Sequence, residues 1–310
     1  MMPEERIHQL MTNLLDSYRT EESMIKIEAS GQLSREAIIR IIGDLRRIIF
    51  AGYFSEKPLR WDSLEYYIGN LLEQVLYTLA KQIEHALPYH NNDGEPLPSA
   101  TELSDIFAGR LSAIRSLLAT DIEAAYDGDP SAFNRDEIIL SYPGIFAIMV
   151  HRLAHELYLL GVPLVPRMMS EYAHSLTGID IHPGATIGHH LFIDHGTGIV
   201  IGETAIIGNF VKIYQGVTIG ALSTRGGQLL HSVKRHPTIE DHVTIYSGAS
   251  ILGGGTVIGE GVVIGSNAFI TRSVPEKTRV SVKNPELQFK LDDKMHNVEF
   301  VQDNAWFYTI

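Results

Sequence analysis

A six-residue repeat runs through the second half of the chain and limits what it can fold into. Apolar residues return on one register, with turn-forming residues between them, as in Ile187-Gly188. A period of six fits neither an α-helix nor a flat strand. It fits a short strand plus a tight turn, three of which close one coil of a parallel β-helix. The register residues are Ile181, Ile187, Ile193, Ile199, Ala205, Val211 and Val217, then Ile239, Ile245 and Ile251, and, after a slip of one residue at 253–255, Ile258, Ile264 and Ile270.

The first half of the chain predicts helices instead. Ser34 looks like a helix start, because apolar residues follow it at spacings of three and four up to Phe50. Similar patterns predict helices over 4–18, 34–50, 64–87, 103–126, 133–140, 144–160 and 166–175. We therefore expect an α+β protein with an all-helical domain (1–177), a parallel β-helix (178–280) and a C-terminal tail (281–310).

Composition excludes several classes of function. The 310 residues carry a net charge of -12 without a basic stripe, so neither nucleic acid nor an anionic membrane is an expected partner. The opening residues are polar and unlike a secretory signal, and no run of eighteen apolar residues occurs. The absence of cysteine excludes disulfides, thiolate metal sites and cysteine nucleophiles. These features predict a soluble cytoplasmic protein.

The segment 220–237 interrupts the repeat with the sequence GALSTRGGQLLHSVKRHP. A β-helix has flat faces, so a loop at one corner is a usual way to build a site on it. A tolerated surface insertion is the competing interpretation. We favour a functional loop, because it gathers histidines and basic residues.

Two histidines are candidates for chemistry. His195 stands two positions after an inward residue, which places it near the outer surface, and His236 lies in the interrupting loop. An imidazole, with an unperturbed pKa of about 6.5, suits a general base at neutral pH. Asp180 and Asp194 are available to orient His195, and the expected eighteen residues per coil place Asp180 on a neighbouring coil near the same corner. A lone surface histidine is nevertheless more often inert.

Longer motifs add a family resemblance. The segments DIHPGATIG (180–188), DHGTGIVIGETA (194–205), VTIGA (217–221) and KRHPTI (234–239), in this order after a helical domain, resemble the serine O-acetyltransferases. The resemblance implies a left-handed β-helix of hexapeptide repeats. It also implies acetyl transfer from acetyl-CoA to the hydroxyl of L-serine for cysteine biosynthesis, with no permanent cofactor, no metal and no covalent enzyme intermediate.

The same resemblance implies a role for each matching residue. His195 would be the general base and Asp180 its orienting partner, while His236 would contact serine and the developing oxyanion. Arg235 would bind the serine carboxylate, for which a planar bidentate donor suits the geometry. Asp129 and Asp194 would bind the ammonium group, and Glu203 matches a motif acid without an assigned role. CoA would lie in a groove between coils, near Gly220, Ala221, Ser247, Gly248, Gly265 and Ser266.

The chain departs from the family pattern in three places. The loop 220–237 is longer, Gly128 stands where arginine is common, and 281–286 replaces the usual turn after the β-helix. Three alternatives stay open: a hexapeptide acyltransferase with another acceptor, a γ-class carbonic anhydrase using the His231/His236 spacing, and a non-catalytic trimeric scaffold. Against another acceptor, an ammonium and a carboxylate call for charges like those of Asp129, Asp194 and Arg235.

The resemblance also implies partners. A homotrimer or a dimer of trimers is expected, with sites shared between neighbours. The terminal Ile310 resembles the residue that inserts into O-acetylserine sulfhydrylase. A terminus that ends in isoleucine by chance is the equally weighted alternative.

Overall fold

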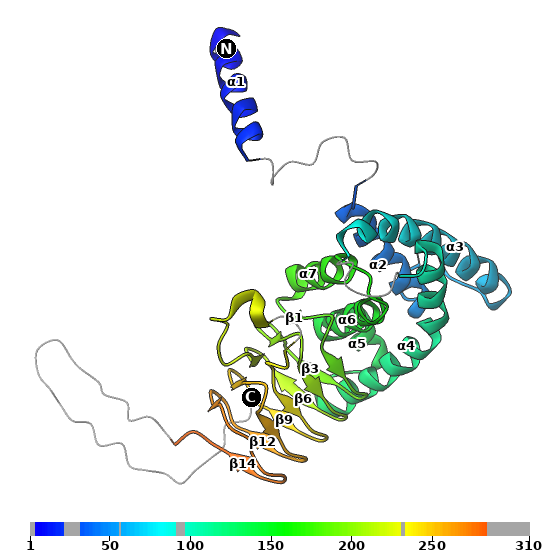
Figure 1. Cartoon of the computed structure of the whole chain (residues 1–310). Coiled ribbons are helices and arrows are strands. Elements are labelled where there is room, and N and C mark those ends of the chain that lie inside the picture. Colours follow the sequence, from blue (N-terminus) through cyan, green and yellow to red (C-terminus); the bar gives the residue numbers. More distant parts are fainter. Residues whose placement is uncertain (1–3, 22–31, 56, 91–96, 231–232, 284–310) are drawn as a thin grey trace, which may run out of the picture.

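The computed structural model describes residues 4–21, 32–55, 57–90, 97–230 and 233–283. A set of helices is followed by a ladder of short strands that stack coil on coil (Figure 1). The last α-helix ends at Thr177 and the first strand begins at Asp180. This is the predicted fold, a helical region followed by a left-handed parallel β-helix.

The helices form close to where the sequence predicts them. Ser34 caps the second helix by accepting a hydrogen bond from the Ala37 backbone N–H. A capping box of Ser99 and Glu102 starts the fourth, and Gly178 ends the last in the left-handed conformation. The helices are α1 (Glu4–Thr20), α2 (Arg35–Ile49), α3 (Trp61–Ala86), α4 (Ala100–Gly128), α5 (Arg135–Ser141), α6 (Pro143–Leu159) and α7 (Val165–Thr177), with short 3-10 helices η2 (Leu87–Tyr89) and η3 (Gly227–Leu230).

No single helix in the described residues combines the length and hydropathy of a membrane span. Helices α5 and α6 have that length and hydropathy only when they are taken together, and a bend of 72° separates them.

The strands form three parallel sheets, one for each side of the coil. Their orders are β1-β4-β7-β10-β13, β11-β8-β5-β2 and β14-β12-β9-β6-β3. The bounds are β1 Asp180–Ile181, β2 Thr186–Ile187, β3 Phe192–Asp194, β4 Val200–Ile201, β5 Ile206–Ile207, β6 Lys212–Tyr214, β7 Thr218–Gly220, β8 Thr238–Ile239, β9 Thr244–Ile245, β10 Ser250–Leu252, β11 Val257–Ile258, β12 Val263–Ile264, β13 Phe269–Ile270 and β14 Arg279–Val280.

The strand register corrects one prediction. Ile181 pairs with Ile201, whereas Ile201 pairs with Ile219, so the first coil is two residues longer than the next. The uniform six-residue register through Ile199 is therefore wrong, although Ile199 is buried. Many sides of the coil bury one residue in the strand and one in the turn two residues before it, as Ile201 and Ile199 do, and the register moves from the strand position to the turn position across residues 194–198. The slip at 253–255 is confirmed, because Ile239 pairs with Ile258, one residue beyond an eighteen-residue step.

Turns of successive coils stack into three corners. The loop corner contains 182–185, 202–205, 221–237 and 253–256, and lies between the sheets of β1 and β2. The His195 corner contains 195–199, 215–217, 246–249 and 265–268, and lies between the sheets of β3 and β1. The third corner contains 188–191, 208–211, 240–243 and 259–262. The two candidate histidines thus lie on two different corners.

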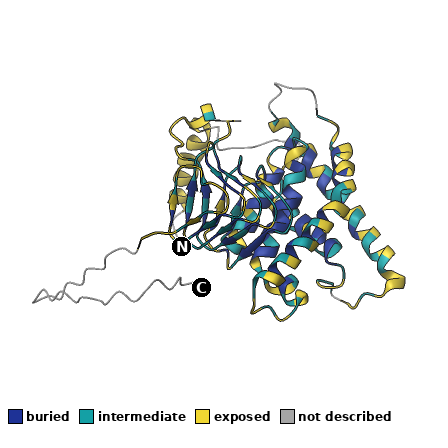
Figure 2. Ribbon diagram, turned by 90° about the horizontal axis from the view of Figure 1, so that it is seen from below, coloured by how far each residue is buried: buried dark blue, intermediate teal, exposed yellow. Residues whose placement is uncertain are grey.

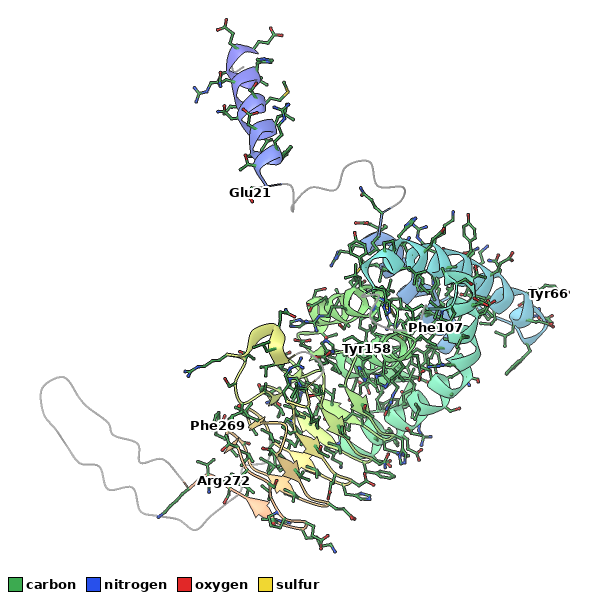
Figure 3. The ribbon with its side chains drawn as sticks, in the orientation of Figure 1. Glu21, Tyr66, Phe107, Tyr158, Phe269 and Arg272 are labelled. Atoms are coloured by element: carbon green, nitrogen blue, oxygen red, sulfur yellow. The ribbon has the colours of Figure 1, made fainter. Side chains whose placement is uncertain are left out.

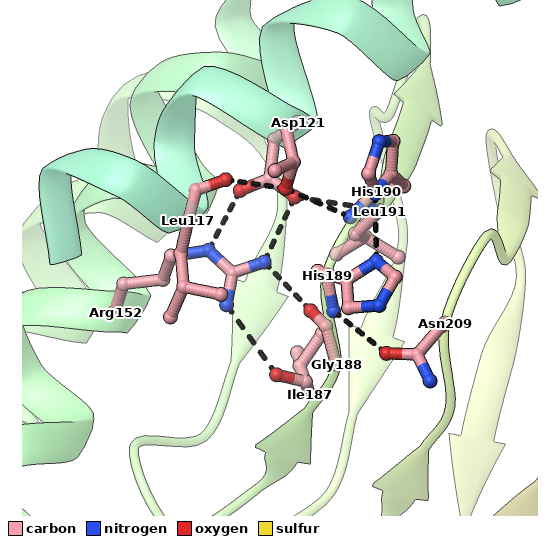
Figure 4. Close-up of polar contacts among 10 residues, drawn as sticks. Leu117, Asp121, Arg152, Ile187, Gly188, His189, His190, Leu191 and Asn209 are labelled. Carbon is pink, nitrogen blue, oxygen red and sulfur yellow. Dashed lines mark hydrogen bonds and ion pairs between the residues drawn. The ribbon is translucent and has the colours of Figure 1, made fainter. Parts of the chain in front are cut away.

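A buried ion pair joins the helices to the first coil. Arg152 of α6 donates to both carboxylate oxygens of Asp121 of α4, at 2.6 and 2.8 Å, and the two side chains are 4% and 0% exposed (Figure 4). Arg152 also donates to the carbonyls of Ile187 and Gly188, and Asp121 accepts from the Leu191 backbone N–H. One hydrophobic core continues from the helices into the β-helix (Figure 2). The helical side chains therefore have fixed positions relative to the coils.

Candidate active site

His195 lies directly after β3 in the left-handed region, with φ of 55°. Its side chain is 58% exposed, as its position in the repeat predicts, and its Nδ1 lies 3.5 Å from Asp194 Oδ1. Burial raises the pKa of the Asp194 carboxyl, and His195 acts in the opposite direction. The two extra residues of the first coil fall in this turn, which spans 195–199 where the next coil has only 215–217.

Asp129, at the C-terminal end of α4, belongs to the same group. Its Oδ2 accepts a hydrogen bond of 2.5 Å from the Tyr142 hydroxyl, and Oδ1 accepts from the Ser131 backbone N–H and hydroxyl at 2.8 and 2.7 Å. The Tyr142 hydrogen bond is the main cause that lowers the pKa of Asp129, and His195 contributes too. Asp129 in turn raises the pKa of Asp194. Two carboxylates therefore face one region beside His195.

Asp180 lies at the expected corner but not on the expected coil. It starts β1 in the same coil as His195, and no hydrogen bond or ion pair joins the two in the described part of the chain. Asp194 makes the closer approach instead. Possible ligand atoms of Asp180, Glu171 and His174 lie within 4.8 Å of one another, but Glu171 is already paired with Arg167 at 2.5 Å. An orienting role for Asp180 stays a prediction.

His236 is held on the loop corner. It is 7% exposed, and its Nδ1 accepts a hydrogen bond of 3.0 Å from the Thr204 backbone N–H. Burial, followed by the charge of Arg235, lowers its pKa to about 4. At neutral pH the ring is therefore uncharged with its proton on Nε2. Gly202 makes this position possible, because a Cβ there would lie 2.1 Å from His236 Cδ2.

Arg235 and Glu203 form an ion pair beside His236. Glu203 also accepts a hydrogen bond of 3.0 Å from the Tyr158 hydroxyl, which lies where the helices meet the β-helix (Figure 3). Burial works to raise the pKa of Glu203, but the hydrogen bonds from Arg235 and Tyr158 outweigh it. Glu203 thus fixes the guanidinium, a contact that the sequence left unassigned.

The six residues expected near CoA divide between two corners. Ser247, Gly248, Gly265 and Ser266 lie on the His195 corner, where the Ser247 hydroxyl is 3.3 Å from that of Ser266. Gly220 ends β7, and Ala221 begins the loop corner. On the His195 corner two glycines of successive coils stack, and a Cβ on Gly216 would lie 3.5 Å from the Gly248 Cα.

Sequence reasoning missed Tyr142, Tyr158 and Thr204. Their hydroxyls act on residues that are distant in sequence, and no spacing rule points to them. His231, one half of the possible zinc spacing, lies outside the described residues. The cavity of about 810 Å³ between α3 and α4 contains none of the candidate residues.

Comparisons with known proteins decide the family. No protein-family model matches the chain. The plasmid-encoded serine acetyltransferase of Synechococcus elongatus is 48% identical over 259 residues, which cover 80% of this chain and 81% of that protein. The chain belongs to the serine acetyltransferase family. The Bacillus subtilis serine acetyltransferase is 49% identical over 125 residues, 40% of this chain and 55% of that protein.

Solved serine acetyltransferases share the fold. Isoform 3 from Entamoeba histolytica, in complex with cysteine, superposes with a TM-score of 0.69 at 36% identity and covers 92% of this chain and 95% of its own. The Neisseria gonorrhoeae serine acetyltransferase, in complex with serine, reaches 0.53 at 29% identity over 78% of this chain and 95% of its own. The family resemblance is confirmed, and the comparisons favour it over a γ-class carbonic anhydrase.

Proposed function

We propose that the chain transfers an acetyl group from acetyl-CoA to the hydroxyl of L-serine, giving O-acetylserine for cysteine biosynthesis. Membership of the serine acetyltransferase family carries this proposal. The two groups of side chains described above support it, because together they match the hydroxyl, ammonium and carboxylate of an amino acid.

His195 acts as the general base. It takes the proton from the serine hydroxyl while that oxygen attacks the thioester carbonyl, so that a C–O bond forms. When the tetrahedral intermediate collapses, the C–S bond breaks and the imidazolium returns the proton to the CoA sulfur. Asp194, 3.5 Å from the ring, stabilises the imidazolium. His236 donates from Nε2 to the oxyanion, because its lowered pKa keeps it neutral and Thr204 occupies Nδ1.

The charged residues bind the two ends of serine. Asp129 and Asp194 present two carboxylates to the ammonium, and a bound cation offsets the rise that Asp129 causes in the pKa of Asp194. Arg235 binds the carboxylate while Glu203 holds the guanidinium from its other side. The pantetheine arm follows the His195 corner past Gly216 and Gly248, where glycine allows close approach to the backbone.

The site is completed between subunits. His195 and His236 lie on different corners of one chain, so a single serine reaches both only if the loop corner of one subunit faces the His195 corner of the next. Three subunits around an axis close such a head-to-tail arrangement. We therefore expect a trimer, with a dimer of trimers as the larger form.

Mixing two inactive variants tests this arrangement. His195→Ala and His236→Ala trimers are each expected to be inactive, but subunit exchange at equal amounts restores about a quarter of the wild-type activity. A shared site is restored wherever an intact His195 meets an intact His236. Activity that stays at the level of the parents after verified exchange would place both histidines in one subunit's site.

The C-terminal residue forms a second interface in our proposal. Ile310 lies outside the described residues, and its family resemblance supports binding to O-acetylserine sulfhydrylase. Deleting Ile310 is expected to abolish co-elution with the sulfhydrylase while serine acetylation continues. Unchanged co-elution would reject this interface and leave the acetyltransferase assignment intact.

The decisive experiment measures thiol release from acetyl-CoA with L-serine as acceptor. His195→Ala is expected to lower kcat about 10²-fold or more, the contribution of a general base. His242→Ala is the matched control, because His242 also occupies a left-handed corner position, with φ of 58° against 55° for His195. No serine-dependent release by the wild type would withdraw the acceptor, and equal losses in both variants would withdraw the base.

A further inference from the structure

Tyr142 connects the start of α6 with the end of α4 beside the proposed serine site. It precedes Pro143 at the start of α6, and its hydroxyl donates to Asp129 Oδ2 at 2.5 Å. We propose that Tyr142 is the positioning residue for the serine ammonium, because it fixes Asp129 beside Asp194. This inference rests on the proposed function, and it concerns a side chain that neither the motifs nor the resemblance indicated.

Asp129 has one anchor outside its own turn. The Ser131 backbone N–H and hydroxyl bind Oδ1, but Ser131 belongs to the same turn and moves with Asp129. The Tyr142 hydroxyl is the one donor from another helix among the described hydrogen bonds to this carboxylate. Its removal leaves Oδ2 free to rotate or to bind water, so the carboxylate loses its fixed direction.

The residues that follow Tyr142 pack against β3, the strand that ends directly before the base. The Tyr142 backbone N–H donates to the Ile138 carbonyl at 3.1 Å, and Pro143 fixes the first turn of α6. Gly144 follows, and a Cβ there would lie 2.7 Å from the Ile193 carbonyl oxygen. Helix α6 therefore touches β3 one residue before Asp194. Through Tyr142, the position of Asp129 is set relative to Asp194 and His195.

The charges around the phenol keep it a donor. Burial, the Asp129 hydrogen bond and the nearby carboxylates of Glu137 and Asp194 all raise the pKa of Tyr142. The hydroxyl therefore stays protonated throughout the neutral range. Because that proton points to Asp129, Tyr142 takes no part in the proton transfer at the serine hydroxyl. Its loss is expected to weaken serine binding and to leave the chemical step intact.

Tyr142→Phe removes the hydroxyl and keeps the ring. We expect the KM for L-serine to rise about tenfold or more, the scale of one lost hydrogen bond to a charged group. The kcat and the KM for acetyl-CoA stay within about twofold, the pattern of a purely binding defect. Tyr53→Phe is the matched control, because the Tyr53 hydroxyl also donates to a carboxylate, Asp136, at 2.6 Å but away from this site. It should leave all three constants unchanged.

A double-mutant cycle with Asp129→Asn separates positioning from general damage. If Tyr142 acts through Asp129, adding Tyr142→Phe to Asp129→Asn raises the serine KM little further. Additive effects, an unchanged serine KM in Tyr142→Phe, or equal losses in kcat and both KM values would each overturn the inference. A wild type without serine-dependent thiol release would instead overturn the proposed function, so the two failures are distinguishable.

Discussion

Gly202→Ala tests the placement of His236 without altering any polar group. The backbone of Gly202 does not have a positive φ, so alanine fits its conformation. The added methyl would, however, lie 2.1 Å from His236 Cδ2 and 2.2 Å from Nε2. Ordinary carbon contacts are about 3.5 Å or longer. The imidazole or the strand must therefore move by roughly 1 Å.

The expected cost follows from what holds His236. Thr204 binds Nδ1 through its backbone, and the Thr204 hydroxyl accepts from the backbone N–H groups of both Arg235 and His236. The ring can yield only by losing these contacts or tilting Nε2 away. A displacement of about 1 Å in a catalytic group costs on the order of 10²-fold in rate. We expect kcat for serine acetylation to fall by that factor, with a destabilisation of about 1–3 kcal/mol.

Thiol-release kinetics and thermal unfolding measure the two effects separately. Gly255→Ala is the control, because Gly255 lies on the same loop corner two coils further on, and its Cβ would have no atom within 4 Å. It is expected to keep wild-type activity. Wild-type kcat in Gly202→Ala would refute the reasoning, since His236 would then be displaced without consequence. An equal loss in both variants would do so too.

Three further predictions concern stability. Arg152→Leu should lower the free energy of unfolding by about 3–5 kcal/mol in urea titrations, because it leaves a buried carboxylate unpaired, whereas Arg60→Leu, at an exposed pair, should cost less than about 1 kcal/mol. Since the pKa of His236 is about 4 when folded and about 6.5 when unfolded, the unfolded chain binds the extra proton and stability should fall as pH drops through this window. In His236→Gln the melting temperature should fall less over the same pH range than it does in the wild type. Gly128→Arg should lower the melting temperature, because even its Cβ would lie 2.6 Å from the Phe192 ring, and Phe192→Leu should partly restore it.

The repeat predicted most of the fold because its apolar residues are the ones that the β-helix buries. Inward aliphatic residues recur whatever the turns contain, so three sheets and their extent follow from spacing. Spacing did not separate the inward residue of a strand from the inward residue of the turn before it. Ile199 continues the count from Ile193, yet its carbonyl accepts from the Asp180 N–H and it stacks over Ile179 rather than Ile181. Because Ile199 and Ile201 are both aliphatic, the hydropathy pattern cannot show the two-residue shift.

Side-chain partners were harder to predict than positions. Spacing put Asp180 near His195, and it put Asp194 next to it, but only the backbone path decides which carboxylate turns toward the ring. Tyr142 is a second case in which the sequence did not predict a side-chain partner. Its role depends on how α6 lies against β3, a tertiary contact permitted by Gly144. The departure at Gly128 is also explained only in three dimensions, since Phe192 fills the space that a larger residue would need.

The two irregularities of the β-helix coincide with its two candidate histidines. A regular coil buries its inward residues and has a flat outer surface, so it offers no concave site for a small substrate. Two extra residues in the first coil turn His195 outward, and the loop 221–237 brings Arg235 and His236 back onto Glu203 and Thr204. Each irregularity lies on its own corner, so neither makes a site alone. In our proposal the assembly of subunits joins them, so we expect restored activity in mixed His195→Ala and His236→Ala trimers.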